Sequence, residues 1–542
     1  MMERKLLALI LTAGLAIACK GNPTDTPKTT PATPEAAESS PNASRALRIA
    51  YFEPKSYDPA HLHGGPGKEV AENLFEGLCS HASDGKIIPG QAKSWTASKD
   101  GLVWTFELRD GLVWSDGTPI TAHDFVWSLR RSIDPKNGNP KASELLAIKN
   151  ARAITKKEIK TIESLGVTAK DNKTVVVTLE SPYPYVTNLM ASGYTLPVPK
   201  HVVEKYGKEW TNPKHLVTNG AYIVHSHTHD QEMQLVANSK YWDAKSVSIQ
   251  TVKYRYTKEA RLAYQWYSLN EIDWCMGLIP QEEIKRLQKQ RDPALHIHPY
   301  DGLFYLVLDT QKPPFNETLV RRAFDLAIDR ARLTRQVTGL GERPAKTFIP
   351  PGMTSSRPPR RVRYDPEEAR KLLAQSKFAA TQPMPSIELM LSSSDLQQKI
   401  AEFLQRNLKE NLGVTLVLQN IDWKTFLDRL NKNEFQMCQL SMGGGFNPAQ
   451  YLDVLETGSQ SNYAKWSNSE FDAVAKEARK ATTKSNVEAA ITKALAIADK
   501  EVPMPALYRL TKRALIRPGL KGFNANAEDR HLLKWLSWGK SE

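Results

Sequence analysis

Cysteine is scarce in this chain, which has only four: Cys19, Cys79, Cys275 and Cys438. So few cysteines exclude the dense disulfide framework of a small secreted protein. A lipid on Cys19 would leave three, so at least one thiol would have no partner. Cys438 lies in a predicted strand, where a free cysteine behaves as a small buried hydrophobic residue.

Long hydrophobic runs are also lacking at the N-terminus. The apolar run Leu6–Ile17 follows Arg4 and Lys5 and is shorter than the roughly 20 residues that span a bilayer. Its length is typical of a signal-peptide core. Two cleavage interpretations compete, since Ala16-x-Ala18 suits ordinary signal peptidase, whereas small residues before Cys19 suit a bacterial lipobox.

We favour lipidation of Cys19 because of the segment that follows it. Residues 20–46 are rich in Pro, Thr, Ser and Ala and have almost no bulky apolar residue. Such a segment cannot bury enough surface to fold, and its prolines keep it extended. We therefore predict a signal peptide over 1–18 and a lipidated cysteine with a disordered tether over 19–45.

Enzyme signatures are missing. The sequence contains no G-x-S-x-G, H-E-x-x-H or G-x-x-x-x-G-K-[ST] pattern. The run Gly443-Gly444-Gly445 lacks the Lys-Ser/Thr of a phosphate-binding loop, and the carboxylates form no recognisable dyad. The sequence predicts neither catalysis nor a cofactor, and an envelope hydrolase remains a remote alternative.

Three histidine sets alternate with other residues: His61/His63, His225/His227/His229 and His296/His298. On a strand, alternate residues point to one side, and a catalytic zinc site needs three such ligands. However, Tyr222 to Gln234 is typical of a hairpin whose turn carries the largest set into solvent. We therefore predict no metal site.

Length and charge limit the remaining classes. A chain of 542 residues favours about three domains, at roughly 150 residues each. The formal charge of +14 comes from Lys and Arg spread along the chain. Nucleic-acid binders gather such charge into arms or stripes, so no nucleic-acid partner is predicted. A basic surface is compatible with an anionic membrane nearby.

The most informative stretch runs from Trp95 to Pro135. Residues Val103–Arg109 alternate with Trp104, Phe106 and Leu108 on one side, which predicts a half-buried strand. Asp-Gly pairs on either side of the strand are typical of tight turns. Thr121 is a predicted cap for a helix that begins near Ala122.

Within this stretch, LRDGLVWSDGTPITAHDFVWSLRRSIDP resembles the signature of the family 5 extracellular solute-binding proteins, the oligopeptide-binding components of ABC importers. Other segments are similar to family motifs in the same order, including PFNETLVRRA at Pro314–Ala323 and TNGAY at Thr218–Tyr222. The resemblance covers roughly Leu47 to Trp538.

The resemblance implies an α/β, two-lobed periplasmic-binding-protein-like fold of class II type with an extra inserted domain. Domain I would be discontinuous, comprising 46–78, 191–297 and 513–542. Domain II would be inserted at 79–190, and domain III, the second lobe, would span 298–512. The chain would cross between lobes near Pro299 and Tyr508, and the lobes would close over a ligand by hinge bending.

The implied function is capture of a peptide or related small solute and its delivery to an ABC permease complex in the inner membrane. The protein would be a monomer in the periplasm or cell envelope, attached to the membrane through Cys19. Alternatives of the same fold bind a murein peptide, a metal chelate or a sugar, and a surface lipoprotein without transport is a further alternative.

The resemblance also implies a ligand-binding cleft. Trp127 resembles a family tyrosine that reaches the ligand from domain II, Trp423 resembles a pocket-wall tryptophan, and Phe304 and Arg509 lie where the family has aromatic residues. The predicted strand Phe435–Met442 and its glycine turn would line the cleft, where peptides pair like an added strand. The remaining expected cleft residues are Gly64, Gly65, Gln439, Ser441, Met442, Gly443, Gly444, Gly445, Phe446 and Asn447.

One family feature is absent. Members resemble one another in an aspartate just after this strand, which pairs with the peptide's α-ammonium group. Here that position falls on Gly444 or Gly445, and Gln439 stands where an arginine is common. An unpaired buried ammonium costs several kcal/mol. The sequence therefore predicts weak discrimination for a free N-terminus, or a ligand without one, and Arg509 as a partner for a ligand carboxylate.

Overall fold

The structure is a computed structural model that describes residues 45–62, 65–349, 363–378, 384–443, 445 and 447–539. Four predicted functional residues, Cys19, Gly64, Gly444 and Phe446, lie outside the described residues. In the described ranges, no helix has both the length and the apolar character that crossing a bilayer requires.

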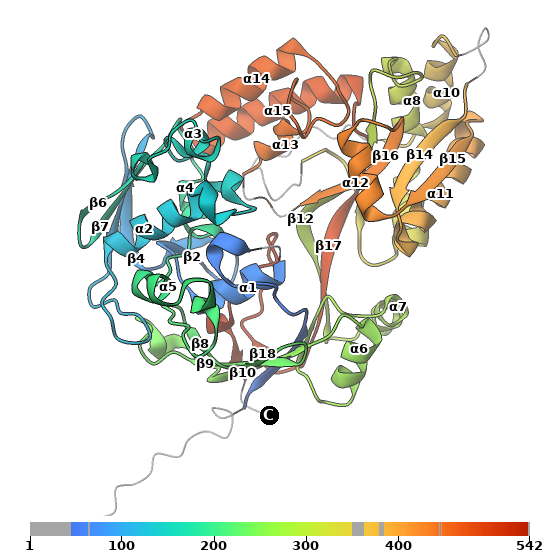
Figure 1. Cartoon of the computed structure of the whole chain (residues 1–542). Helices are drawn as coiled ribbons and strands as arrows, with labels where there is room; N and C mark the ends of the chain where they lie inside the picture. The colour runs from blue at the N-terminus through green and yellow to red at the C-terminus, as the bar shows by residue number, and fades with distance from the viewer. Residues whose placement is uncertain are drawn as a thin grey trace, which may run out of the picture. The chain divides into compact units, whose positions relative to one another are not determined.

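Eleven strands form one mixed sheet (Figure 1). In order of pairing, they are β15 (Leu416–Ile421), β14 (Ile387–Ser392), β16 (Met437–Gly443), β12 (Leu295–Leu308), β17 (Ala506–Ile516), β11 (Trp274–Met276), β1 (Leu47–Tyr51), β10 (Thr251–Tyr256), β9 (Glu232–Ala237) and β8 (Tyr222–Thr228), while β13 (Arg343–Pro344) pairs with β17. The long antiparallel pair β12 and β17 therefore joins a group of N-terminal strands to a group from the second half of the chain.

A separate antiparallel sheet lies within residues 92–178. Its order is β4 (Ala92–Ala97), β5 (Val103–Leu108), β7 (Thr174–Thr178) and β6 (Val167–Asp171). Helix α2 (Ala122–Ile133) contacts β6 and β7, and Phe125, Ser128 and Leu129 are among its buried residues. Thr121 and Asp124 form a capping box at its start, since the Thr121 N–H donates to Asp124 Oδ2 at 2.8 Å. The predicted strand and helix of this stretch are confirmed.

The remaining strands and α-helices flank these sheets (Figure 1). The N-terminal half contains α1 (Gly65–Leu74), β2 (Cys79–His81), β3 (Ile87–Pro89), α3 (Ala151–Thr155), α4 (Val186–Met190), α5 (Lys200–Tyr206), α6 (Ala260–Ser268) and α7 (Gln281–Gln290). The second half contains α8 (Thr318–Ala327), α9 (Arg330–Leu333), α10 (Pro366–Ala374), α11 (Asp395–Leu412), α12 (Trp423–Asn431), α13 (Gln450–Asp453), α14 (Ser469–Lys480), α15 (Lys484–Glu501), β18 (Leu520–Lys521) and β19 (Ser537–Trp538).

The apolar residues gather into several cores. One core packs β1, α1 and the four-stranded sheet around Trp114, Trp210 and Tyr222, all nearly inaccessible to solvent. Two others fill the faces of the β12–β14–β16 region, and Tyr185 of the N-terminal half packs in one of them. Cys438 is fully buried on β16, as predicted, and Cys79 and Cys275 are also buried free thiols.

Three elements differ in their ends from what the local sequence predicts. The sequence predicts a turn at Gly64–Gly67 and a helix over Glu69–Leu78, but the helix occupies Gly65–Leu74. It predicts Asn316 as the N-cap of the next long helix, but the N-cap of α8 is Glu317 and the first helical residue is Thr318.

The sequence also predicts a strand over Leu303–Leu308. This strand is confirmed as the last part of β12, which begins earlier, at Leu295, and is irregular between Pro299 and Leu303.

Candidate functional site

Six of the predicted cleft residues of the second half lie on three adjacent strands. In the pairing of β12 with β16, Gly302 lies opposite Gly443, Leu303 opposite Met442 and Phe304 opposite Ser441. On the other side of β12, Leu303 pairs with Arg509 of β17. The sheet thus places Phe304, Ser441, Met442, Gly443 and Arg509 side by side, although they come from segments distant in sequence.

Exposure along β16 changes from its first half to its second. Gln439 is buried, and neither its amide oxygen nor its amide nitrogen has a hydrogen-bond partner among the residues that the structure describes. Ser441 and Gly443 are exposed, and Met442 is half-buried. The strand therefore offers accessible backbone and small side chains at its C-terminal end, whereas Gln439 packs inside.

Phe304 is buried by a neighbour on β17. Its ring stacks on Tyr508, with the ring centroids 5.0 Å apart and the planes 9° apart. Only 5% of Phe304 is exposed. Phe304 therefore packs beneath the sheet surface next to Ser441 and has little area open to a ligand.

The guanidinium group of Arg509 makes its hydrogen bonds within the protein. Nη2 donates to the carbonyl oxygen of Thr347, to its hydroxyl at 2.8 Å and to the carbonyl oxygen of Ile349 at 2.5 Å. Burial lowers the pKa of Arg509 to about 10 although the nearby Tyr451 and Asp301 oppose that shift. Because neutral carbonyl groups occupy these donors, the arrangement gives little support to Arg509 as a partner for a ligand carboxylate.

Other predicted residues lie on separate elements. Trp127 is half-buried on α2 against the N-terminal core. Trp423 begins α12, is 56% exposed, and stacks on Phe426 at 5.4 Å between ring centroids. Gly445, which follows β16 in the sequence, is half-buried. Trp423 is therefore the predicted aromatic with the most open face.

Two cavities adjoin predicted residues. One, of about 320 Å³, has Gly65, Glu69, Trp274, Lys512, Phe523 and His531 in its lining. The other, of about 210 Å³, has Tyr183, Asn447 and Arg479 in its lining. The Asn447 amide donates to the Tyr183 hydroxyl at 3.4 Å, which links the predicted domain II to the predicted domain III.

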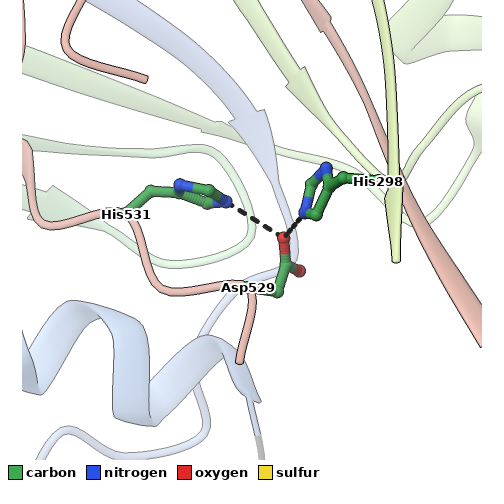
Figure 2. A group of neighbouring side chains, drawn as sticks. All are labelled: His298, Asp529 and His531. Carbon is green, nitrogen blue, oxygen red and sulfur yellow. Dashed lines mark hydrogen bonds and ion pairs between the residues drawn. The ribbon is translucent and has the colours of Figure 1, made fainter. Parts of the chain in front are cut away.

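A histidine cluster that the sequence did not reveal lies beside the larger cavity. Figure 2 shows His298 of β12 and His531 of the C-terminal segment converging on Asp529. Asp529 Oδ1 lies 2.8 Å from His298 Nε2 and 3.0 Å from His531 Nε2, and Lys512 Nζ lies 3.1 Å from Oδ2. Burial alone would raise the pKa of Asp529, but these partners hold it well below its usual range.

These three residues could supply ligand atoms to a metal ion, since the atoms lie within 4.8 Å of one another. However, His298 Nδ1 is buried and has no hydrogen-bond partner in the described part of the chain. A metal on Nε2 would leave the hydrogen on Nδ1 with no acceptor, whereas an Nε2–H donating to Asp529 leaves Nδ1 bare. The contacts therefore favour a hydrogen-bonded structural cluster, and the pattern Asp529-x-His531 was the available sequence signal.

The histidines of the β8–β9 hairpin behave differently from their alternating pattern. An irregularity between Val224 and Ser226 interrupts the pairing of β8, so His225 does not continue the alternation. His227 Nε2 and His229 Nδ1 both contact Glu53 Oε1, at 3.0 and 2.9 Å. Glu53, His229 and Asp230 offer a second group of possible ligand atoms, at an exposed turn.

Asp301 is the functional candidate that sequence reasoning missed. It precedes Gly302 on β12, is 8% exposed, and has a carboxylate that no other described residue contacts by a hydrogen bond or ion pair. A single aspartate in an apolar segment gives no sequence signal of this kind, because only the fold determines whether a cation lies beside it.

Comparison with known proteins places this geometry in context. Residues 86–463 match the family model described as bacterial extracellular solute-binding proteins, family 5 middle. The periplasmic oligopeptide-binding protein OppA of Escherichia coli strain K12 is 35% identical over 480 residues, which cover 87% of this chain and 88% of OppA. The periplasmic murein peptide-binding protein MppA of the same strain is 35% identical, over 88% of this chain and 89% of MppA.

A solved structure agrees with these relatives. The unliganded open form of the periplasmic murein tripeptide-binding protein MppA superposes with a TM-score of 0.82 at 33% identity, over 91% of this chain and 97% of that chain. The predicted fold class, a two-lobed α/β binding protein, is therefore confirmed. The chain belongs to the family 5 extracellular solute-binding proteins.

Proposed function

We propose that this protein captures peptides in the periplasm and delivers them to an ABC permease in the inner membrane. The observation that carries the proposal is 35% identity to two peptide-binding relatives over nearly the whole length of each. The exposed end of β16 supports it, because extended peptides bind by adding main-chain hydrogen bonds to accessible strands. Murein peptides are a second candidate cargo, favoured by the similarity to MppA. No observation in the described residues favours a sugar or a metal chelate.

The cleft that we propose lies at the β16–β12–β17 junction. It includes Ser441, Met442, Gly443, Gly445 and the open face of Trp423, with Trp127 and Asn447 reached on closure. Phe304 and Gln439 support it from beneath, and Gly65 borders the adjoining cavity of about 320 Å³. Gly64, Gly444 and Phe446, which lie outside the described residues, are also proposed to line the cleft.

The proposal is tested with a mixed tripeptide library and the purified full-length protein. We expect native mass spectrometry to detect retained, uncleaved peptides and small-angle scattering to show a smaller radius of gyration when they are bound. The physical reason is closure of the proposed lobes, 46–297 with 513–542 against 298–512, about the two crossing strands β12 and β17. Failure to retain any peptide would reject peptide capture, and accumulation of cleaved products would favour the hydrolase alternative instead.

We also propose that Cys19 carries the lipid that holds the protein at the membrane. Two features support this proposal: the small residues Ala16 and Ala18 just before Cys19, and the Pro- and Thr-rich segment after it. Cys19→Ser is expected to move the protein from the membrane fraction to the soluble periplasmic fraction, because two or more acyl chains are needed for stable attachment. The matched control is Cys79→Ser, a buried thiol, which should leave the fractionation unchanged. Absence of labelled fatty acid in the wild-type protein would contradict the lipid anchor.

A further inference from the structure

Asp301 is a buried acid whose backbone is fully bonded and whose side chain is not. Its N–H donates to the carbonyl oxygen of Ala527 at 2.7 Å, and its own carbonyl oxygen accepts from the Tyr451 hydroxyl at 3.2 Å. Within the described ranges, no donor or cation contacts its carboxylate, although 92% of the residue is shielded from solvent. The backbone therefore holds in place a carboxylate that has lost much of its hydration without gaining a partner.

The charged groups around Asp301 do not compensate for this loss. Glu528 of the C-terminal segment adds a like charge near Asp301, although Arg530 pairs with it at 2.9 Å. Arg509 of β17 acts from beyond bonding distance, since its guanidinium group bonds Thr347 and Ile349. Tyr451 of α13 is a further titratable neighbour. Burial and Glu528 together raise the pKa of Asp301 to about 7, against the opposing effect of Arg509.

The position of Asp301 connects it with the exposed end of β16. Its neighbour Gly302 pairs with Gly443, and a Cβ on Gly443 would lie 3.3 Å from the Asp301 carbonyl oxygen. The sequence between Glu434 and Asp453 contains no carboxylate. The pairing of β12 with β16 therefore places the carboxylate of Asp301 beside a segment that has no carboxylate of its own.

From this geometry we propose that Asp301 is an ammonium-binding site that holds the charged N-terminal amine of a bound peptide. The proposal rests on the proposed function. A peptide amine is the cation that a peptide-binding cleft would supply, and a hydrogen-bonded ion pair offsets the cost of the buried carboxylate. The sequence has no carboxylate at Gly444 or Gly445, and we therefore expected the protein to distinguish poorly between peptides with and without a free N-terminus. The position of Asp301 leads to the opposite expectation.

The test compares a mixed tripeptide library with the same library after N-acetylation, on wild-type protein, Asp301→Asn and the control Asp395→Asn. Asp395 is exposed at the start of α11, and both variants replace one carboxyl group by an amide of the same size. We expect wild type and Asp395→Asn to retain free peptides about 10- to 100-fold more tightly than acetylated ones, as hydrogen bonds to charged groups imply. In Asp301→Asn the ratio should fall to about one, with acetylated peptides retained as by wild type.

A pH series on the wild-type protein gives a readout that needs no variant. Between pH 7.5 and 5.5, the preference for free over acetylated peptides should fall by about tenfold, because the carboxylate takes up a proton. The amine, with a pKa of about 7.7–8.0, only becomes more fully charged over this range. Equal retention of both libraries by wild type, or an unchanged preference in Asp301→Asn, would overturn the inference alone. Retention of neither library by wild type would overturn the proposed function together with it.

Discussion

Replacement of Lys534 by methionine is expected to destabilise the folded protein by about 3–5 kcal/mol, the usual cost of leaving a buried charge without its partner. Lys534 Nζ lies 2.7 Å from Glu76 Oε1, and the two residues are 7% and 5% exposed. Burial alone would raise the pKa of Glu76, but Lys534 and the hydroxyl of Tyr241 hold it below its ordinary value. Without Lys534, the carboxyl group must take up a proton or remain charged in a poorly solvated place.

The Glu76 site is a network that ties the C-terminal segment to the first part of the chain. The carboxylate also accepts from the Tyr241 hydroxyl at 2.6 Å and from Gln91 Nε2 at 3.0 Å. Urea unfolding at pH 7 would measure the loss, with Lys399→Met on the exposed surface of α11 as the control. The double variant Glu76→Gln/Lys534→Met should lose less than Lys534→Met, because no unpaired charge remains. A loss below about 1 kcal/mol in the single variant would contradict this account.

The second large effect is expected at Asp58, whose replacement by asparagine should cost about 3–5 kcal/mol at pH 7. Asp58 is 5% exposed, and the Arg131 guanidinium group donates hydrogen bonds to both carboxylate oxygens, at 2.8 and 2.6 Å. Trp210 Nε1 donates to Oδ2 at 3.2 Å. Burial would raise the pKa of Asp58, but hydrogen bonds from Arg131 and His61 hold it far below its ordinary value.

The sign of the pH effect follows from that lowered pKa. A carboxylate with a folded pKa below its unfolded value of about 3.9 stabilises the protein above that value and loses the contribution as pH falls through the folded pKa. The difference in unfolding free energy between wild type and Asp58→Asn should therefore shrink between about pH 5 and pH 2. Urea unfolding across this range would measure it. Asp428→Asn, at an exposed pair with Lys432, is the control and should change stability by less than about 1 kcal/mol. A difference independent of pH would contradict the assignment to Asp58.

Much of the local structure could be predicted from short-range chemistry. Apolar alternation at Trp104, Phe106 and Leu108 predicted β5, because successive side chains on a strand face opposite sides. Thr121 marked the start of α2, because the first N–H groups of a helix need an acceptor outside the helix. The errors at α1 and α8 are shifts of a few residues, where several polar residues could serve as caps.

The candidate site was less accessible to sequence reasoning. The resemblance implied that Ser441 and Gly443 line a ligand cleft. In the structure both residues are exposed at the C-terminal end of β16, and their role in binding stays a prediction. It also suggested Arg509 for a ligand carboxylate, but the guanidinium donors bond Thr347 and Ile349. No pattern in the sequence shows whether an arginine is free or bonds backbone carbonyl groups, because here the partner, Ile349, lies 160 residues away in the sequence.

The sequence by itself determined the family, the class of fold and the absence of a recognisable catalytic motif, because these reside in contiguous motifs and local periodicity. The tertiary structure alone decided which charges meet. It joined Glu76 to Lys534, placed His298 and His531 on Asp529, and left the carboxylate of Asp301 without a partner among the described residues. The physical reason is that the free energy of a buried charge depends on its neighbours in space, and strand pairing brings together segments hundreds of residues apart.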